Sequence, residues 1–253
     1  MTSAFMQKHS NVFVFDTPEQ LAVAAAERFV ECAAKLHGEL DRFSVALAGG
    51  RTPKRVYELL ATERFKSRVE WSQVYLFFGD ERCVPPTHPD SNYAMVYETL
   101  ISKVAIPAEN VRRIIGEGEP DESARTYEIK LRTFFAGLTW PRFDLVLLGM
   151  GEDGHTASLF PHSDALQEQS RWVIATKNEL TSQDRITLTL PVFNHAAHVV
   201  FLVTGKEKAQ RLKEVLHPQP GSGLLPAQAI TPINGTVEWF TDAAAASRLQ
   251  HAE

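Results

Sequence analysis

The residues best suited to chemistry lie in a glycine-rich stretch near the middle of the chain, residues 149–155. Glu152, Asp153 and His155 are titratable, and the glycines around them let the backbone turn sharply. An imidazole titrates near neutral pH, and a carboxylate two residues away can orient it and stabilise its charged form. The pattern therefore indicates a general base, His155, assisted by Asp153.

The segments on either side indicate how this stretch is positioned. The apolar run 143–148 predicts a strand that is buried on both faces, as in a parallel sheet. Thr156 or Ser158 is expected to begin a helical turn after the glycines. Open α/β sheets bind ligands beyond the carboxyl ends of their strands, so we expect the chemistry at this loop.

Strand and helix patterns alternate along the whole chain. This alternation predicts one α/β domain over residues 1–253, doubly wound around a mainly parallel, Rossmann-like sheet. Further strands are expected at 11–15, 43–48, 74–79, 111–114, 172–175, 185–190 and 198–203, with an edge strand at 237–240. Helices are expected at 17–37, from 52 onward, at 92–103, 121–136, 205–216 and 226–230, and at the C-terminus.

Composition restricts the class of protein. Apolar residues make up 44% of the 253 positions, enough for a large core, and the net charge of −5 argues against a general nucleic-acid binder. Neither a secretory signal nor an apolar run of about 20 residues is seen, so we expect no membrane segment. Cys32 and Cys83 lack metal-ligand or redox spacing. These features predict a soluble, cytoplasmic protein.

A second cluster of interest is the turn that follows the strand at 43–48. It consists of Gly49, Gly50, Arg51 and Thr52. Its backbone N–H groups, its hydroxyl and the helix that starts there together suit a phosphate. The plainer interpretation is an ordinary tight turn.

Charged residues at other strand and helix ends extend this picture. Asp80 and Arg82 directly follow the strand at 74–79, Arg185 begins a strand, and Lys208 lies in the first turn of a helix. Each alone is commonly a solvated charge or part of a surface ion pair. Taken together, they favour an anionic, sugar-like ligand with a proton acceptor that works at neutral pH.

Other chemistries fit the sequence poorly. Residues 149–154 match the dinucleotide pattern G-x-G-x-x-G, but no acidic residue ends a strand about 20 positions later, and two carboxylates would face the pyrophosphate. The G-x-S-x-G elbow of serine hydrolases is missing. His195 and His198 could suggest a metal pair, but they have no acidic partner nearby in the sequence.

Several segments resemble the 6-phosphogluconolactonase family, within the larger group that shares a fold with glucosamine-6-phosphate deaminase. The matching segments occur in the family's order and span about three quarters of the chain. They are LAGGRTP (47–53), FFGDERCVP (77–85), DSN (90–92), GMGEDGHTASLFP (149–161), RITLT (185–189), VTGKEKA (203–209) and LPAQAI (225–230).

The resemblance implies hydrolysis of 6-phospho-D-glucono-1,5-lactone to 6-phosphogluconate, the second step of the oxidative pentose phosphate pathway. It implies no cofactor and no metal. The expected partner is the small phosphorylated sugar lactone, without nucleic acid or membrane, and the protein is expected to be a monomer or weak homo-oligomer.

Site residues are carried over from the family position by position. His155 corresponds to the histidine that activates water, and Asp80 and Arg82 correspond to polar residues that line the site. The turn from Gly49 to Thr52, Arg185 and Lys208 correspond to the phosphate-binding elements. The group that stabilises the oxyanion stays open between Arg82 and loop N–H groups.

Two alternatives remain within the same fold. The deaminase pattern also has an acid at Asp80 and an Asp-Gly-His ending at His155, but it continues with a glutamate where this chain has Phe160. A binding-only regulator would keep the phosphate elements and tolerate loss of the base, whereas His155 is present. The stretch 160–164 is also more polar than in lactonases.

Overall fold

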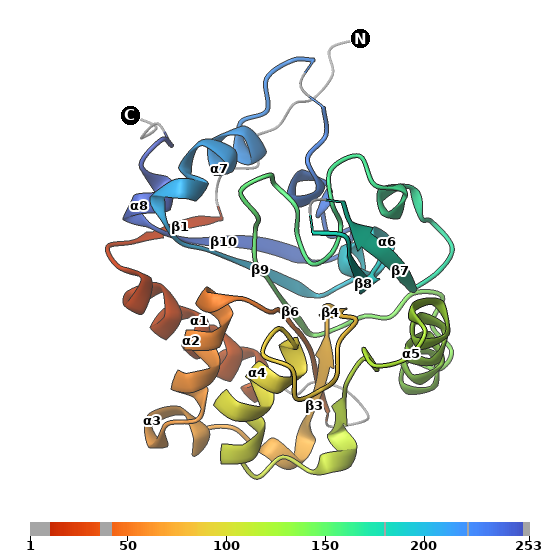
Figure 1. Ribbon diagram of the computed structural model, residues 1–253. Helices are drawn as coiled ribbons and strands as arrows, with labels where there is room; N and C mark the ends of the chain where they lie inside the picture. The colour runs from red at the N-terminus through yellow and green to blue at the C-terminus, as the bar shows by residue number, and fades with distance from the viewer. Residues whose placement is uncertain (1–10, 36–41, 180, 222, 250–253) are drawn as a thin grey trace.

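A seven-stranded parallel sheet forms the centre of the molecule (Figure 1). This computed structural model describes residues 11–35, 42–179, 181–221 and 223–249. Across the sheet the strands are β1 (Val12–Phe15), β10 (Thr236–Asp242), β9 (His198–Val203), β6 (Leu145–Leu148), β2 (Phe43–Leu47), β3 (Val74–Phe78) and β5 (Val111–Arg112). All neighbouring pairs are parallel, so their carboxyl ends lie at one edge of the sheet.

Helices cover both faces of this sheet. The α-helices are α1 (Pro18–Ala34), α2 (Arg51–Leu60), α3 (Glu63–Lys66), α4 (Asn92–Thr99), α5 (Pro120–Phe134), α6 (Leu190–Asn194), α7 (Ala209–Leu216) and α8 (Ala243–Ala246). Short 3₁₀ helices are η1 (Trp71–Gln73), η2 (Ile101–Lys103), η3 (Ala108–Asn110), η4 (Asp164–Gln167), η5 (Lys206–Lys208) and η6 (Pro226–Ala229).

Strand β3 shows how the two faces are covered. Tyr75 and Phe77 pack against Phe134 of α5, with ring centroids 4.9 and 5.0 Å apart. The next residue, Phe78, instead contacts Tyr93 of α4 at 6.0 Å. Successive side chains of a strand point to opposite faces. Since α4 and α5 therefore lie on opposite sides, the prediction of a doubly wound α/β fold is confirmed.

A separate three-stranded antiparallel sheet stands over the carboxyl edge of the main sheet. Its order is β4 (Asp80–Arg82), β8 (Gln183–Leu188) and β7 (Val173–Asn178). The segments 172–175 and 185–190 were correctly predicted as strands. The sequence indicated neither β4 nor the departure of these strands from the main sheet, because antiparallel pairing between distant segments leaves no local pattern.

The expected helical turn at Thr156 or Ser158 is wrong. The Thr156 hydroxyl donates to the carbonyl of Gly149 at 2.8 Å and so closes the loop back onto the end of β6. Ala157 has a left-handed backbone, with φ of 49°, and the N–H of Leu159 donates to Thr156 at 2.9 Å. A threonine hydroxyl used in this way cannot cap a helix.

Two other expectations concern an edge strand and the end of the first helix. The segment 237–240, predicted as an edge strand, belongs to β10, which pairs with both β9 and β1. The first helix ends at Ala34, and the expected extension to residue 37 falls outside the described residues.

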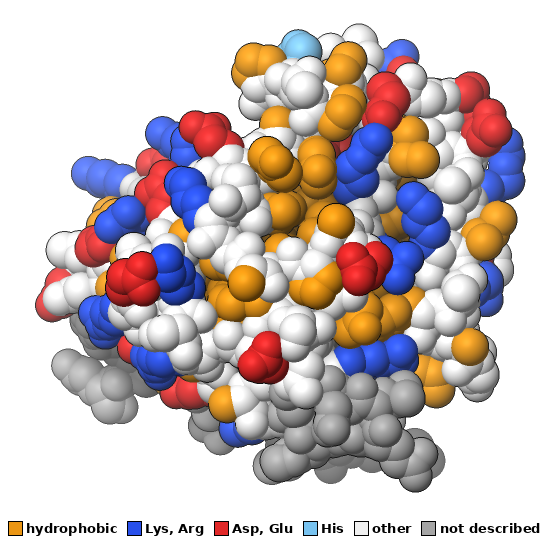
Figure 2. Space-filling view, turned by 90° about the horizontal axis from the view of Figure 1, so that it is seen from below, with side chains coloured by type: hydrophobic (Ala, Val, Ile, Leu, Met, Phe, Trp, Pro, Cys, Tyr) orange, Lys and Arg blue, Asp and Glu red, His pale blue; other side chains and the backbone are white. Residues whose placement is uncertain are grey.

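Charges on the face in Figure 2 are mixed, with Lys and Arg side chains interspersed among Asp and Glu. That face therefore lacks the broad basic surface that would attract nucleic acid. Among the described residues, no helix has the length and apolar character required to span a bilayer.

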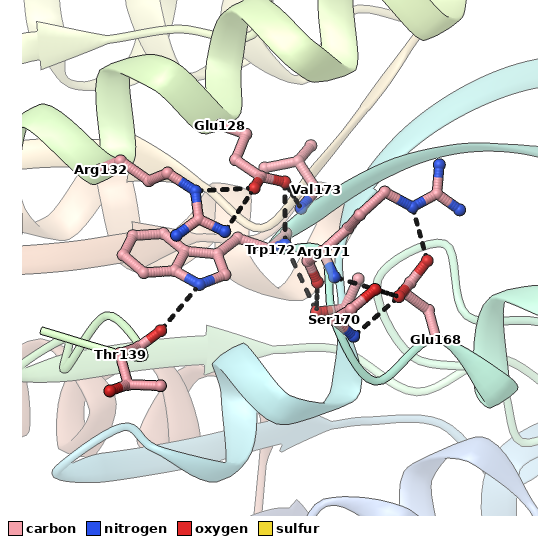
Figure 3. Close-up of polar contacts among 9 residues, drawn as sticks. Glu128, Arg132, Thr139, Glu168, Ser170, Arg171, Trp172 and Val173 are labelled. Carbon is pink, nitrogen blue, oxygen red and sulfur yellow. Dashed lines mark hydrogen bonds and ion pairs between the residues drawn. The ribbon is translucent and has the colours of Figure 1, made fainter.

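Helix α5 holds the small sheet in place through Glu128 (Figure 3). One carboxylate oxygen of Glu128 accepts the backbone N–H groups of Trp172 and Val173, at 2.9 and 3.1 Å, where β7 begins. Its other oxygen binds Arg132 at 2.7–2.8 Å, and the Arg132 guanidinium lies 4.3 Å from the centre of a Trp172 ring. Two backbone donors near the start of β7 thus depend on a single side chain.

A second carboxylate organises the chain just before β7. Glu168 accepts hydrogen bonds from Ser170 and Arg171, from both backbone and side chain (Figure 3). Burial by itself would raise the pKa of Glu168, but these hydrogen bonds outweigh it and lower the pKa to about 2. The contribution of Glu168 to stability is therefore present above its ordinary pKa of 4.5 and is lost as pH falls toward 2.

Replacing Glu128 with alanine should destabilise the protein by about 1.5–3 kcal/mol, since charge-assisted hydrogen bonds to buried backbone groups are lost. Urea denaturation measures this change. Arg125→Ala, at an exposed position of the same helix, is the control and should stay within about 0.5 kcal/mol of the wild type. Equal effects of the two changes would show that Glu128 does not anchor β7.

Candidate active site

A cavity of about 620 Å³ opens at the carboxyl edge of the main sheet. Loops that follow β2, β3, β6 and β9 form its floor, and the small antiparallel sheet forms one wall. The structure brings together nearly all the residues predicted from the sequence. The cavity is lined by Gly49, Gly50, Arg51, Thr52, Asp80, Arg82, His155, Arg185 and Lys208.

Asp153 does not line this cavity but contacts His155. Its Oδ1 lies 2.6 Å from Nδ1 of the His155 ring and also accepts the backbone N–H of His155 at 3.0 Å. An ionised Asp153 keeps the ring proton on Nδ1, which leaves the lone pair on Nε2. Nε2 is thus the nitrogen that can accept a proton.

The ionisation of Asp153 is secured by its partner. Partial burial raises the pKa of Asp153, but the hydrogen bond and the charge of His155 outweigh burial and lower the pKa to about 2. Asp153 therefore stays a carboxylate at any physiological pH.

Gly151 allows this pair to form. The N–H of Gly151 donates to the carbonyl of His155 at 2.8 Å, which folds the loop tightly. A Cβ atom at Gly151 would overlap the His155 ring at Nδ1 and would also press on Asp153. By contrast, a Cβ atom at Gly149 would meet nothing within 4 Å.

Phe160 packs against the other side of the imidazole. The two ring centroids are 5.1 Å apart, and Phe160 is buried. Phe160 and Asn178 also line a second cavity of about 840 Å³, and Asp153 belongs to its wall. Phe160 and Asn178 are thus shared by the walls of both cavities.

Asp80 is a buried carboxylate whose oxygens are already engaged. Its Oδ2 accepts the Ser158 hydroxyl at 2.7 Å, and its Oδ1 accepts the Asn92 amide at 3.2 Å. Ser158 is fully buried, so its hydroxyl is a support for Asp80 and is not available as a nucleophile. Ser158 links the His155 loop to the end of β3.

Two of the expected phosphate-binding elements, the turn after β2 and Lys208, lie on the β2 and β9 side of the cavity. Gly50 caps α2 with φ of 102°, a left-handed conformation that favours glycine, and it directs the helix N-terminus at the cavity. Thr52 Oγ1 lies 2.7 Å from Thr204 Oγ1, which joins this turn to the loop after β9. Lys208 ends η5 on that same loop.

The resemblance suggested that Arg185 binds the phosphate, whereas the structure places it on the small sheet, away from the turn after β2. It is the register partner of Arg82 across the antiparallel pair β8–β4. The side chains of directly opposed residues project from the same face of a sheet. Arg185 therefore neighbours Arg82, whose Nη1 donates to the carbonyl of Asp90 at 2.6 Å.

Some contributors were not identified as site residues from the sequence. Asn92 lines the cavity and binds both the carbonyl and the carboxylate of Asp80. A signal existed in the segment DSN, but its role depends on how α4 packs. No pattern in the sequence singled out Thr204 as a site residue. Glu152, noted for its charge, is exposed and lines neither cavity.

The two histidines considered as a metal pair have separate partners. Nδ1 of His195 lies 2.6 Å from the carbonyl of Pro191, and Nδ1 of His198 lies 2.8 Å from the hydroxyl of Thr236. Each ring is therefore engaged by its own surroundings.

These features define an α/β enzyme with a histidine–carboxylate pair beside a cavity that is also lined by cationic side chains. The chain belongs to the family described as glucosamine-6-phosphate isomerases/6-phosphogluconolactonase, which matches residues 16–239. That family includes both of the activities weighed from the sequence.

Several individual relatives carry the name 6-phosphogluconolactonase. A 6-phosphogluconolactonase from Nostoc sp. is 42% identical over 211 residues, covering 82% of this chain and 85% of the relative. One from Haemophilus influenzae is 37% identical over 93% of this chain and 98% of the relative. The solved structure of 6-phosphogluconolactonase from Trypanosoma cruzi superposes with a TM-score of 0.85 at 32% identity, over 98% of this chain and 100% of that chain.

The close approach at Gly151 gives a testable prediction. Gly151→Ala should lower kcat by roughly 10²-fold or more, because the added methyl displaces the pair expected to act in proton transfer. Gly223→Ala is the control and should keep near-normal activity, since its Cβ has open space and Gly223 lies outside both cavities. Steady-state kinetics on the two purified variants checks this, and similar activities would contradict the role assigned to the loop.

Proposed function

We propose that this protein hydrolyses 6-phospho-D-glucono-1,5-lactone to 6-phosphogluconate, the second step of the oxidative pentose phosphate pathway. The observation that carries the proposal is the Asp153–His155 pair, set in a cavity that also holds anion-binding elements. The relatives named 6-phosphogluconolactonase support the same reaction. A lactone is an activated ester, so water and a positioned base suffice without a covalent nucleophile.

His155 is the proposed general base. Its Nε2 takes a proton from water as the water oxygen bonds to C1 of the lactone, and the carbonyl becomes an oxyanion. The bond between C1 and the ring oxygen then breaks, and the imidazolium returns the proton to that oxygen. Asp153 holds the ring tautomer and stabilises the imidazolium.

The remote phosphate supplies the binding energy that fixes the ring. We assign it to the turn from Gly49 to Thr52 at the N-terminus of α2, together with Lys208. Neither Arg51 nor Lys208 has an ion-pair partner within 4 Å among the described residues, and both side chains line the cavity.

We also propose that the enzyme works in the cytoplasm, as a monomer or weak homo-oligomer, without cofactor or metal. The proposed chemistry requires neither redox nor Lewis-acid assistance. The small number of cysteines fits a reducing compartment.

Purified protein should be assayed on freshly generated 6-phosphogluconolactone, with spontaneous hydrolysis subtracted. Clear acceleration is the expected result, and no acceleration would overturn the proposal. Glucosamine 6-phosphate serves as the second substrate. Release of ammonia above background would identify a deaminase instead, which Phe160 disfavours because no carboxylate stands there.

His155→Asn should lower kcat by roughly 10²- to 10⁴-fold while changing KM far less, since the phosphate elements lie elsewhere in the cavity. Wild-type activity should fall as pH drops, because imidazolium cannot accept a proton. Asp153 remains ionised through this range, so its titration adds no step near neutral pH. Ser158→Ala should be mild by comparison, and near-normal kcat in His155→Asn would refute the proposed base.

Lys208→Ala should reduce kcat/KM for the phosphorylated lactone about 10- to 100-fold, the equivalent of one charge-assisted hydrogen bond. Activity on unphosphorylated gluconolactone should barely change. Lys206→Ala is the control, because Lys206 lies on the same 3₁₀ helix but is exposed and outside the cavity. Equal losses on both substrates would show that Lys208 does not bind the phosphate.

A further inference from the structure

The side chains of Arg82 and Arg185 place two positive charges side by side on the small sheet. The two residues are directly opposed in the antiparallel pair β4–β8, so their side chains leave the same face, and both line the cavity. Like charges directly opposite each other across strands are destabilising. An arrangement of this kind calls for a compensating negative group.

Within the described part of the protein, no carboxylate pairs directly with the positive charges of Arg82 and Arg185. Among the described residues, neither arginine has a carboxylate within 4 Å, and the Arg185 side chain makes no hydrogen bond. The Nε atoms of both are buried without a partner; a third such atom belongs to Arg112, outside the cavity. Burial, followed by the charge of Arg82, lowers the pKa of Arg185, although Asp80, Glu81 and Asp90 act in the opposite sense.

The location of the pair distinguishes it from the phosphate elements. The same face of the small sheet carries Asp80 and Thr187, which both bind Ser158, at 2.7 and 3.4 Å. Ser158 is three residues from His155, so this face is fastened to the loop of the proposed base. The phosphate elements are instead joined to each other through Thr52 and Thr204.

The cavity therefore has two cationic regions, whereas the proposed substrate carries only one permanent anion, its phosphate. Hydrolysis creates a second anion at C1, first as the oxyanion and then as the product carboxylate. We propose that Arg82 and Arg185 form a two-guanidinium clamp for this second anion at the reacting end. The inference rests on the proposed function and assigns Arg185 to C1 rather than to the phosphate.

The chemistry of the clamp suits a planar oxyanion group. A guanidinium presents several N–H donors in a fixed plane and binds carboxylates through paired hydrogen bonds. Arg82 is already held by the carbonyl of Asp90, so part of the clamp is preorganised before ligand binds. The repulsion between the two arginines is relieved as negative charge develops between them, which favours the transition state over the neutral lactone.

Calorimetric binding of two probes tests the clamp without any turnover. The probes are 6-phosphogluconate and glucitol 6-phosphate, which differ only in whether C1 is a carboxylate or an alcohol. The wild type should prefer the acid by at least about 10-fold. Arg185→Gln should reduce this preference to about threefold or less, while changing the affinity for glucitol 6-phosphate by less than about threefold.

Lys208→Gln is the matched control, since it should weaken both probes alike and keep the preference for the acid. Equal weakening of both probes by Arg185→Gln would place that arginine at the phosphate and overturn the clamp, as would a wild type without preference. Without ligand, Arg185→Gln should melt at or above the wild-type temperature, because one of two like charges is removed. A large drop would mean a structural role and would also overturn the clamp.

The two proposals can fail separately. A protein that shows the preference but does not accelerate lactone hydrolysis would refute the proposed function alone. A protein that hydrolyses the lactone but shows no preference would refute the clamp alone.

Discussion

The candidate active site depends on one short hydrogen bond, between Asp153 and the ring of His155. The same carboxylate oxygen also accepts the backbone N–H of His155, so ring and main chain are held by a single atom. This is possible only in a loop that turns tightly around Gly151. The strand before it is buried on both faces, which gives the loop a rigid base.

The other residues of the cavity are tied to this loop by a chain of polar contacts. Ser158 binds Asp80, Asp80 binds Asn92, and the Asn92 side chain lies so close to Gly49 that no Cβ would fit there. The chain of contacts therefore runs from the loop of the proposed base, His155, to the turn expected to bind phosphate. Preorganisation of this kind fixes the distance between the reacting carbon and a remote anchor.

Local patterns allowed much of this arrangement to be predicted from the sequence. The apolar run before Gly149 identified β6, and the alternation of strands and helices predicted the doubly wound sheet. The candidate site residues were found because strand ends in a parallel sheet converge at one edge. Each of these inferences uses residues that are close together in the chain.

The remainder depended on contacts between distant segments. The pairing of β4 with β8 joins residues about a hundred positions apart, and nothing local indicates that Arg185 will face Arg82. The failed helix at Thr156 has a more local cause, because its hydroxyl bonds back to the carbonyl of Gly149 instead of capping the next turn. There a hydrogen bond from side chain to backbone overrode the expected start of a helix.

Phe160 has a consequence for how such a scaffold could be redesigned. A single aromatic side chain, shared by the walls of both cavities, is part of what divides the space beside the imidazole into two chambers. A smaller residue at this position would widen the space beside the imidazole in the direction of the second cavity. The wall at Phe160 is therefore a natural position for protein engineers who want to admit bulkier ligands, and the same change would admit more water to the His155 ring.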